Sequence, residues 1–396
     1  MKEWRKVKLG DLYEVHNGLS KGRQFFGTGF PFLTFSNVFN NWFLPNELDS
    51  LVQTTDKERE ACSIKYGDVF ITRTSETMNE LGMSSVALKD YPDATYNGFT
   101  KRLRPFTDKV LPNYIGYYLR SPKFRGKFMA FSSMTTRASL ANDNLLNMEI
   151  ELPPMDVQKK IATTLSRYDS LIDNYQKQIK LLEEAAQRLY KEWFVNLRFP
   201  GHENTKIVDG VPEGWEKKKL EEIADIIMGQ SPKSEFYNKE QKGLPFHQGV
   251  GSYGTRFVND IVYTTSYTRI AEANSLLFSV RAPVGRLNIS KNKIVIGRGL
   301  AAMKHKNGMQ SFLFYMLKER FFKDNIIGNG SIFASISKNE LLNLRFIIPA
   351  NSIIYKYERF ASDIDAKIQK LDSQLRLLTE SRDRLLPKLL SGEIEV

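Results

Sequence analysis

The side chains that could perform catalysis form no recognisable motif in this chain. No Gly-x-x-x-x-Gly-Lys-Ser/Thr phosphate loop is present, which argues against ATPase activity. Phe26-Gly-Thr-Gly29 is better explained as a turn than as a nucleotide-binding loop, because no strand and downstream acid accompany it. The only adjacent prolines, Pro153 and Pro154, follow Leu152, so the Asp/Asn-Pro-Pro-aromatic tetrad of amino-methyltransferases is missing. The four histidines have no metal-ligand spacing: His16, His202, His247 and His305.

Positively charged side chains indicate a different chemistry, the binding of a polyanion. The 57 Lys and Arg outnumber the 45 Asp and Glu and give a net charge of +12. Each phosphate that Lys or Arg neutralises releases condensed counterions, which favours a nucleic-acid partner. Two basic clusters lie at similar places in the two halves of the chain, at residues 101–137 and 279–323, with Asp108 and Glu319 as their only acids. A solvated basic face is the alternative for either cluster alone.

Phosphate contacts position a protein on DNA, whereas polar side chains on loops read the base edges. Arg can bind guanine O6 and N7, and Gln can bind adenine N6 and N7. In the first half the candidate DNA contacts are Thr72, Arg73, Thr74, Lys101, Arg102, Arg120, Lys123, Arg125, Lys127, Thr135, Thr136 and Arg137. In the second half they are Gln248, Tyr253, Arg256, Arg269, Arg281 and Arg298. An ordinary surface or turn role remains the alternative for each residue taken alone.

The chain contains two copies of one plan. Residues 4–20 align with residues 215–231 at an offset of 211, which pairs two tryptophans and two glycines. Residues 139–147 align with residues 335–343 at an offset of 196, so the middle of the first copy is 15 residues longer. The two copies are similar at their ends and different in their middles. This pattern indicates one scaffold that is used twice and carries two different recognition surfaces.

Each copy ends in a segment with a strict apolar heptad. The steps of four and three residues indicate a coiled-coil seam rather than the wider stripe of a globular helix. In the first segment the seam residues are Ile161, Leu165, Tyr168, Ile172, Tyr175, Ile179, Leu182, Ala186, Leu189 and Trp193. In the second they are Tyr357, Ala361, Ile364, Ile368, Leu371, Leu375, Leu378, Arg382, Leu385 and Leu389. Two separate amphipathic helices, each packed on its own domain, are the alternative.

The expected fold is α+β, with two mixed α/β domains separated by a long antiparallel two-helix coiled coil. About 33 residues at 1.5 Å each give a helix of roughly 50 Å, which could act as a spacer. Arg382 interrupts the apolar seam and suggests its end or a partner contact, and Pro387 should end or kink the second helix. The expected boundaries are 1–154 for the first domain, 155–198 for the first helix, 199–350 for the second domain with a linker at 199–214, and 351–396 for the second helix and tail.

The cysteine content and the distribution of apolar residues indicate the cellular compartment. Cys62 is the single cysteine, which excludes an intramolecular disulfide and a thiolate zinc cluster. The N-terminus lacks the apolar stretch of a signal peptide, and no segment approaches about 20 apolar residues. We therefore expect a soluble cytoplasmic protein with no membrane contact and no bound metal.

The order of variable region, helix, variable region and helix resembles the specificity subunits of type I restriction–modification enzymes over essentially the whole chain. Four motifs carry the resemblance: the Trp-x-x-x-x-Leu openings, the Leu-Leu-Asn…Pro-Pro entry into the first helix, residues 181–194, and the C-terminal Leu-Leu-Ser-Gly-Glu-Ile. In such families the recognition domains vary freely, so no contact residue is transferred from the family.

The resemblance implies two target-recognition domains, each reading one half of a bipartite, asymmetric DNA site. It implies that the helices set the spacing and bind two methyltransferase subunits, which carry S-adenosylmethionine and methylate adenine. A restriction subunit that uses ATP and Mg²⁺ would join them, and this chain would be non-catalytic and hold no cofactor. The alternatives are a coiled-coil scaffold whose basic heads bind another polyanion, and a self-sufficient methyltransferase, which the missing motifs disfavour.

Overall fold

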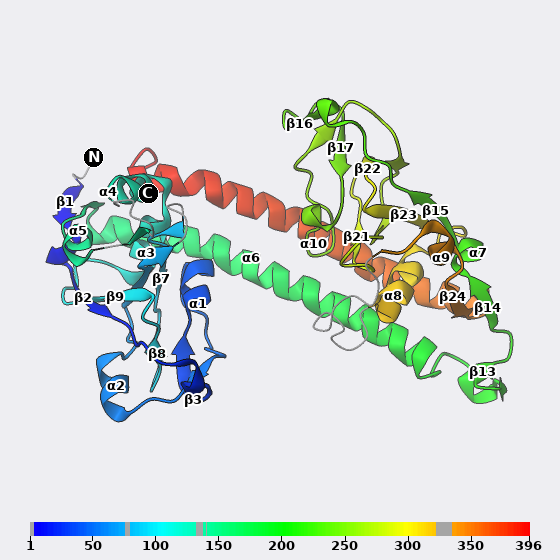
Figure 1. Cartoon of the computed structure of the whole chain (residues 1–396), viewed down its shortest axis with the longest axis horizontal. Coiled ribbons are helices and arrows are strands. Elements are labelled where there is room, and N and C mark those ends of the chain that lie inside the picture. The colour runs from blue at the N-terminus through cyan, green and yellow to red at the C-terminus, as the bar shows by residue number, and fades with distance from the viewer. Residues whose placement is uncertain (1–3, 76–79, 132–137, 140, 322–334) are drawn as a thin grey trace. The chain divides into compact units, whose positions relative to one another are not determined.

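The computed structural model describes residues 4–75, 80–131, 138–139, 141–321 and 335–396. The chain divides into two compact units (Figure 1). Unit 1 consists of residues 1–174 and 374–396, and unit 2 consists of residues 175–373. Each long helix contributes to both units, so the helices do not form a domain of their own.

Unit 1 is built on small, mainly antiparallel sheets, with one parallel strand pair, β3 with β8. Strand β1 pairs with β11, the main sheet has the order β2-β9-β5-β7, and a second sheet has the order β4-β3-β8. Its elements are β1 (Arg5–Lys8), β2 (Tyr13–Asn17), β3 (Phe26–Leu33), α1 (Phe35–Asn40), β4 (Leu51–Val52), α2 (Asp56–Ala61), β5 (Val69–Thr72), β6 (Thr74–Ser75), β7 (Ser84–Val86), β8 (Thr95–Tyr96), β9 (Thr100–Pro105), α3 (Pro112–Arg120), α4 (Pro122–Phe131), β10 (Ala138–Ser139), α5 (Asn142–Leu146) and β11 (Glu149–Leu152).

Unit 2 repeats this plan. Strand β14 pairs with β24, the main sheet has the order β15-β23-β20-β21, and the second sheet has the order β16-β18-β17-β22-β19. Its elements are β12 (Ile207–Val208), β13 (Val211–Pro212), β14 (Glu216–Lys219), α7 (Leu220–Ile223), β15 (Ala224–Met228), β16 (Tyr237–Asn238), β17 (Leu244–His247), β18 (Tyr263–Thr264), β19 (Ile270–Ala271), β20 (Leu276–Ser279), β21 (Leu287–Ile289), β22 (Ile294–Ile296), β23 (Leu300–His305), α8 (Gln310–Phe321), α9 (Lys338–Leu342) and β24 (Arg345–Ile348).

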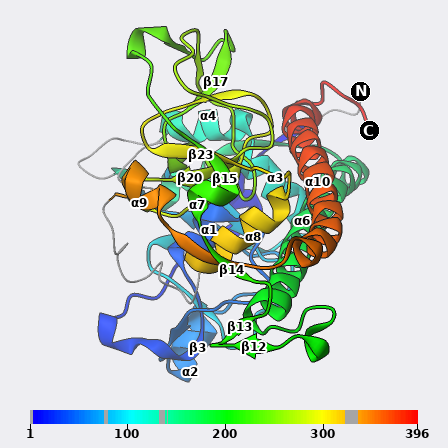
Figure 2. The same ribbon diagram turned by 90° about the vertical axis from the view of Figure 1, so that its right-hand side faces the viewer.

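The duplication read from the sequence is therefore a duplication of topology. In each unit a short helix, α3 or α8, is buried between the main sheet and the long helices. In unit 2, for example, α8 lies against both β23 and the last long helix (Figure 2). The variable second sheets differ in strand number, three against five, which accounts for the divergence of the two middles.

The glycine that the two copies share has the same physical role in both units. A Cβ on Gly18 would lie 2.1 Å from the carbonyl oxygen of Asn97, and a Cβ on Gly229 would lie 2.1 Å from that of Gly297. Both distances are far below van der Waals contact. Only glycine allows the end of β2 or β15 to pass this close to the segment before β9 or β23.

The long helices are α6 (Met155–Tyr190), which continues as one π-helical segment at Lys191–Val195, and α10 (Asn351–Ser391). Every heptad position named above is buried or half-buried. Leu171, Leu181 and Leu377, which lie off the heptad, are exposed by 45%, 63% and 56%. Position in the heptad, rather than hydrophobicity alone, therefore determines which leucines are buried.

The two helices run antiparallel within each unit. In unit 1 Arg382 contacts Asp169, while Leu386 and Leu389 share a core with the earlier residues Ile161 and Leu165. In unit 2 the Tyr357 hydroxyl donates to the carbonyl of Ala186 at 3.1 Å, while the later residue Asp365 and the earlier residue Glu183 bind the same arginine. The predicted α+β class, with two mixed domains and a pair of long antiparallel helices, is confirmed.

Two details of the second helix differ from expectation. Pro387 does not end α10, which continues to Ser391. Since Pro387 lies in the last turns, the helix loses only the bond to the carbonyl four residues earlier. Arg382 does not mark the end of the seam either, because Leu385 and Leu389 continue it. Its guanidinium donates to Asp169 at 2.7 Å and packs over Trp42.

A tyrosine–aspartate contact joins the short helix to a long helix in both units. The Tyr117 hydroxyl donates to Asp169 Oδ2 at 2.5 Å, and the Tyr315 hydroxyl donates to Asp365 Oδ1 at 3.0 Å. The two aspartates are related by the same offset of 196 as the heptads. Burial raises the pKa of both tyrosines, so each hydroxyl stays protonated and remains a donor.

An arginine completes each contact, but it comes from a different place. Arg382 on α10 pairs with Asp169 in unit 1. In unit 2 Arg256, in the loop between β17 and β18 of the second sheet, pairs with Asp365 at 2.6 Å. Arg256 is only 2% exposed and stacks on Phe314, 3.5 Å from the ring centre. Unit 2 thus fixes its sheet region to the helices through a buried charge.

Replacing Asp365 with alanine should lower the free energy of unfolding by about 3 kcal/mol, because it leaves a buried guanidinium without its main partner. Urea denaturation followed by circular dichroism measures the change. The matched control is Asp363→Ala on the same helix, whose side chain is exposed and whose loss should change stability by less than about 0.5 kcal/mol. Equal effects of the two substitutions would show that the Arg256–Asp365 pair contributes nothing.

Candidate nucleic-acid interface

Equivalent loops gather at one end of the main sheet in each unit. The Arg73 amide donates to the Phe99 carbonyl at 2.9 Å, and the Val280 amide donates to the Gly299 carbonyl at 2.9 Å. The next residues, Thr74 and Arg281, pair antiparallel with Ser139 and Ser335 respectively. We call this end of each sheet the recognition edge. It consists of Ser20, Arg73, Thr74, Phe99 and Lys101 in unit 1, and of Ser231, Gln248, Arg269, Arg281 and Arg298 in unit 2.

The recognition edge of unit 2 is held by a small polar network. The Ser231 hydroxyl donates to Gln248 Oε1 at 2.8 Å and accepts from the Arg298 amide at 3.2 Å. The Gly297 amide donates to the His247 carbonyl at 2.8 Å, and the Gly299 amide donates to the Gln248 carbonyl at 3.1 Å. These bonds fix two loops side by side, with Gln248 and Arg298 exposed at their surface.

Three exposed arginines give this edge an unbalanced positive charge. Arg269, Arg281 and Arg298 make no ion pair or side-chain hydrogen bond with any residue that the structure describes. Free guanidinium groups on a rigid edge can bind phosphate or the O6 and N7 atoms of guanine. The predicted DNA contacts Gln248, Arg269, Arg281 and Arg298 thus come together in space, and their role in DNA binding stays a prediction.

His247 holds the loop behind this edge. Its Nδ1 lies 2.8 Å from Ser252 Oγ, and its Nε2 lies 3.0 Å from Asp260 Oδ1. Burial raises the pKa of Asp260, but the hydrogen bonds from His247 and Asn292 outweigh this effect and lower the pKa below its ordinary value. The order Ser–His–Asp does not indicate a hydrolase, because the imidazole is fully buried and so cannot meet a substrate.

The recognition edge of unit 1 is less charged. Arg73 is half-buried and Phe99 is exposed. Lys101 is buried with its Nζ against Asn142 Oδ1, and burial, followed by the nearby charge of Arg73, lowers its pKa. Thr72 is fully buried; its hydroxyl donates to the Glu80 carbonyl at 3.1 Å and accepts from the Met83 amide at 2.9 Å.

Several predicted DNA contacts serve the fold instead. Arg120 donates to four backbone carbonyls, those of Val38, Phe39, Asn41 and Ser84, and burial lowers its pKa to about 10. This guanidinium ties α1 and β7 to α3. These bonds take up its Nε and Nη2 donors inside the fold, and a role of Arg120 in DNA binding stays a prediction.

Four more basic residues of the first cluster are engaged within unit 1. Arg102 is 3% exposed and donates to the Ser63 carbonyl at 2.6 Å. Arg125 donates to the Leu81 carbonyl at 2.6 Å, and Lys123 and Lys127 both pair with Glu151. These contacts give the four residues a structural role that does not require DNA.

The remaining candidate DNA contacts are either buried or lack a described side chain. Thr72 and Lys101 are buried, as described above, and Arg256 is committed to Asp365 and Glu183, so none of the three is available as a direct DNA contact. Tyr253 lies with its hydroxyl buried in unit 2. Thr135, Thr136 and Arg137 lie outside the described residues, and for Thr74 the backbone alone is described.

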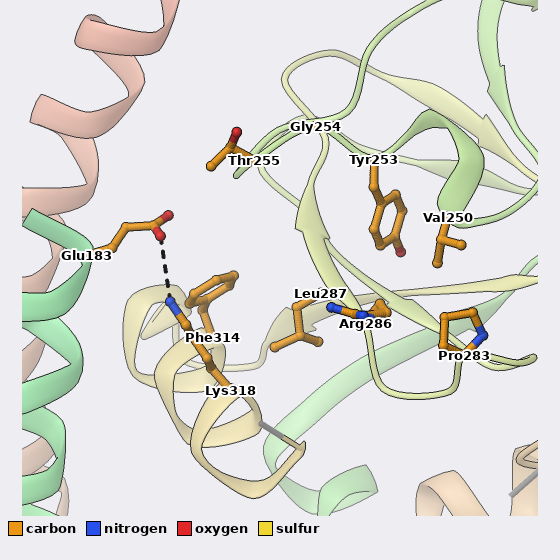
Figure 3. A pocket seen from close by; sticks show the side chains of 10 residues that line it. All are labelled: Glu183, Val250, Tyr253, Gly254, Thr255, Pro283, Arg286, Leu287, Phe314 and Lys318. Carbon is orange, nitrogen blue, oxygen red and sulfur yellow. Dashed lines mark ion pairs between the residues drawn. The ribbon is translucent and has the colours of Figure 1, made fainter. Parts of the chain in front are cut away.

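A cavity of 340 Å³ lies beside Tyr253 in unit 2 (Figure 3). Glu183 and Lys318 face each other across its rim with 3.6 Å between the charged atoms, and Phe314 and Leu287 supply apolar wall. Burial lowers the pKa of Lys318, which the carboxylate of Glu183 opposes. Glu183 and Lys318 neutralise each other, and Arg286 is the other charged residue that lines the cavity.

The described residues contain no group of His, Cys, Asp and Glu arranged to hold a metal ion. Among the helices that they form, none is both long and apolar enough to span a bilayer. The exposed arginines of the recognition edge therefore remain the site with the clearest chemistry.

Comparison with known proteins agrees with this geometry. Residues 1–184 and 212–379 match the family described as the type I restriction modification DNA specificity domain. A Methanocaldococcus jannaschii protein, provisionally named the MjaX type I restriction enzyme specificity subunit, is 30% identical over 100% of this chain and 94% of its own length. The MjaIX specificity subunit of the same organism is 28% identical over the same shares.

A solved structure has the same fold. The crystal structure of a type I restriction–modification S subunit from M. genitalium aligns with a TM-score of 0.62, covering 98% of this chain and 96% of that one, at 14% sequence identity. The family match spans both copies of the duplicated plan and most of the chain. This chain therefore belongs to the family of type I restriction–modification DNA specificity subunits.

Proposed function

We propose that this chain is the DNA specificity subunit of a type I restriction–modification complex and that each unit reads one half of a bipartite, asymmetric site. The observation that carries the proposal is one scaffold present twice with two unlike recognition edges. In unit 2 three unpaired arginines and Gln248 supply donors for guanine and adenine. In unit 1 the corresponding positions carry different side chains, so the two halves of the site should differ in sequence.

The long helices set the distance between the half-sites and bind two adenine methyltransferase subunits. Their antiparallel pairing within each unit and the buried heptad positions support a stiff element. The partners supply the chemistry: S-adenosylmethionine belongs to the methyltransferase, and ATP and Mg²⁺ belong to a restriction subunit. This chain is non-catalytic, holds no cofactor and works in the cytoplasm, in keeping with its missing catalytic motifs and its single, buried cysteine.

The function is tested by expressing the chain with its neighbouring methyltransferase and sequencing the methylated host genome. The expected outcome is methylated adenine in two unlike half-sites at a constant separation, together with a complex whose mass corresponds to two methyltransferase chains for each copy of this one. Methylation unchanged by deletion of this chain, or failure of the two proteins to co-purify, would refute the proposal.

Replacing Arg281 and Arg298 with alanine should weaken binding of duplex DNA and reduce the slope of log K against log salt by about 2, since each lost phosphate contact contributes about 0.9. Fluorescence anisotropy at several salt concentrations measures the slope. The matched control removes two exposed lysines of unit 2 that lie outside the basic cluster, Lys206 and Lys217, and should leave the slope close to that of the wild type. If both pairs reduce the slope equally, general charge rather than the recognition edge attracts the DNA.

A further inference from the structure

A large aromatic side chain stands exposed on the recognition edge of unit 1. Phe99 directly precedes β9 and is 64% exposed, the joint highest exposure among the large apolar residues described. A phenylalanine left in water gives up the free energy that its burial would provide. An exposed ring of this kind at a functional edge suggests a surface that is covered on binding.

The backbone of Phe99 is held rigidly. Its amide donates to Asn97 Oδ1 at 2.9 Å, and its carbonyl accepts from the Arg73 amide at 2.9 Å. Asn97 is itself buried, and its Nδ2 donates to the Leu33 carbonyl at 3.0 Å. The ring is therefore presented from a fixed point between two sheets rather than from a loose loop, which reduces the entropy lost on binding.

A cation lies next to the backbone of Phe99. The amide of Arg73 is bonded to the Phe99 carbonyl. Arg73 is half-buried and makes no ion pair within the described part of the chain. A guanidinium without a counter-charge beside an exposed aromatic residue suits a nucleic acid, whose phosphates neutralise the cation while a base stacks on the ring. An apolar protein surface would leave this charge unpaired.

We propose that the ring of Phe99 stacks on a base of the half-site bound by unit 1. This inference rests on the proposed function. It adds a contact whose strength depends on how easily the DNA unstacks and deforms at that step, and not on the hydrogen-bonding groups at the base edges. The corresponding residue in unit 2 is Gly299, where a Cβ would lie 2.5 Å from the Gln248 carbonyl oxygen. No side chain fits there, so the contact is confined to one half-site.

The test uses the purified complex with the methyltransferase and a fluorescent duplex that carries the site mapped by methylation. Phe99→Ala should weaken binding about fivefold or more, because stacking of one base on an aromatic ring contributes at least about that factor. Phe106→Ala is the matched control. Phe106 directly follows the other end of β9 and is 61% exposed, and its loss should leave the affinity unchanged.

A scan with abasic sites then identifies the base. One nucleotide at a time is made abasic through both half-sites, and the affinities of wild type and Phe99→Ala are compared at each position. We expect one position, or two adjacent positions in a single half-site, at which wild type and Phe99→Ala bind the abasic duplex with equal affinity. At that position the base on which the ring stacks has already been removed, so the substitution has no further effect. Absence of any such position overturns the stacking contact.

Further variants separate stacking from other causes. Phe99→Leu keeps an apolar side chain without a π face and should stay weakened, whereas Phe99→Tyr should bind like the wild type. Full binding by the leucine variant, unchanged DNA affinity in the alanine variant, or loss of methyltransferase association instead of DNA affinity would each overturn the inference. If the wild-type complex does not prefer the mapped duplex over a scrambled one, the proposed function itself fails.

Discussion

The hydrogen bond between a buried tyrosine and a helix carboxylate organises each unit. Tyr117 with Asp169, and Tyr315 with Asp365, join the short helix behind the main sheet to a long helix. Each aspartate also carries a charge that an arginine must balance, and removal of either partner leaves a buried group unpaired. The position of the sheet against the long helices, and with it the direction of the recognition edge, depends on this contact.

The sequence predicted the features that repeat. The heptad of α6 and α10 was visible because its period is local, and the offsets of 211 and 196 revealed the duplicated topology. The continuation of α10 through Pro387 was not predicted, because proline inside a helix favours a break or kink, whereas the residues around it, Leu386 and Leu389, are packed in the core of unit 1. The tyrosine–aspartate contacts were not predicted, although Asp169 and Asp365 share the offset of 196. That shared position could have indicated them, because a carboxylate beside an apolar seam needs a hydrogen-bond donor or a cation.

The candidate DNA contacts were harder to predict. Composition cannot separate an arginine that faces solvent from one that satisfies backbone carbonyls inside the fold, and Arg102 and Arg120 belong to the second kind. In unit 2 Arg281 and Arg298 lie at the ends of loops and are exposed. Arg256 is buried, and its partner Asp365 lies 109 residues further along the chain, where the sequence alone could not indicate it. Phe99 was missed because only polar side chains were considered as readers of DNA.

The different origin of the two arginines limits how the halves of the protein can be exchanged. In unit 1 both charges of the pair, Asp169 and Arg382, lie on the long helices, so the recognition segment that precedes α6 can be replaced without removing either charge. In unit 2 Arg256 belongs to the recognition segment while Asp365 belongs to α10. A hybrid that imports this segment from a relative must also import a cation for Asp365, or else change both residues together.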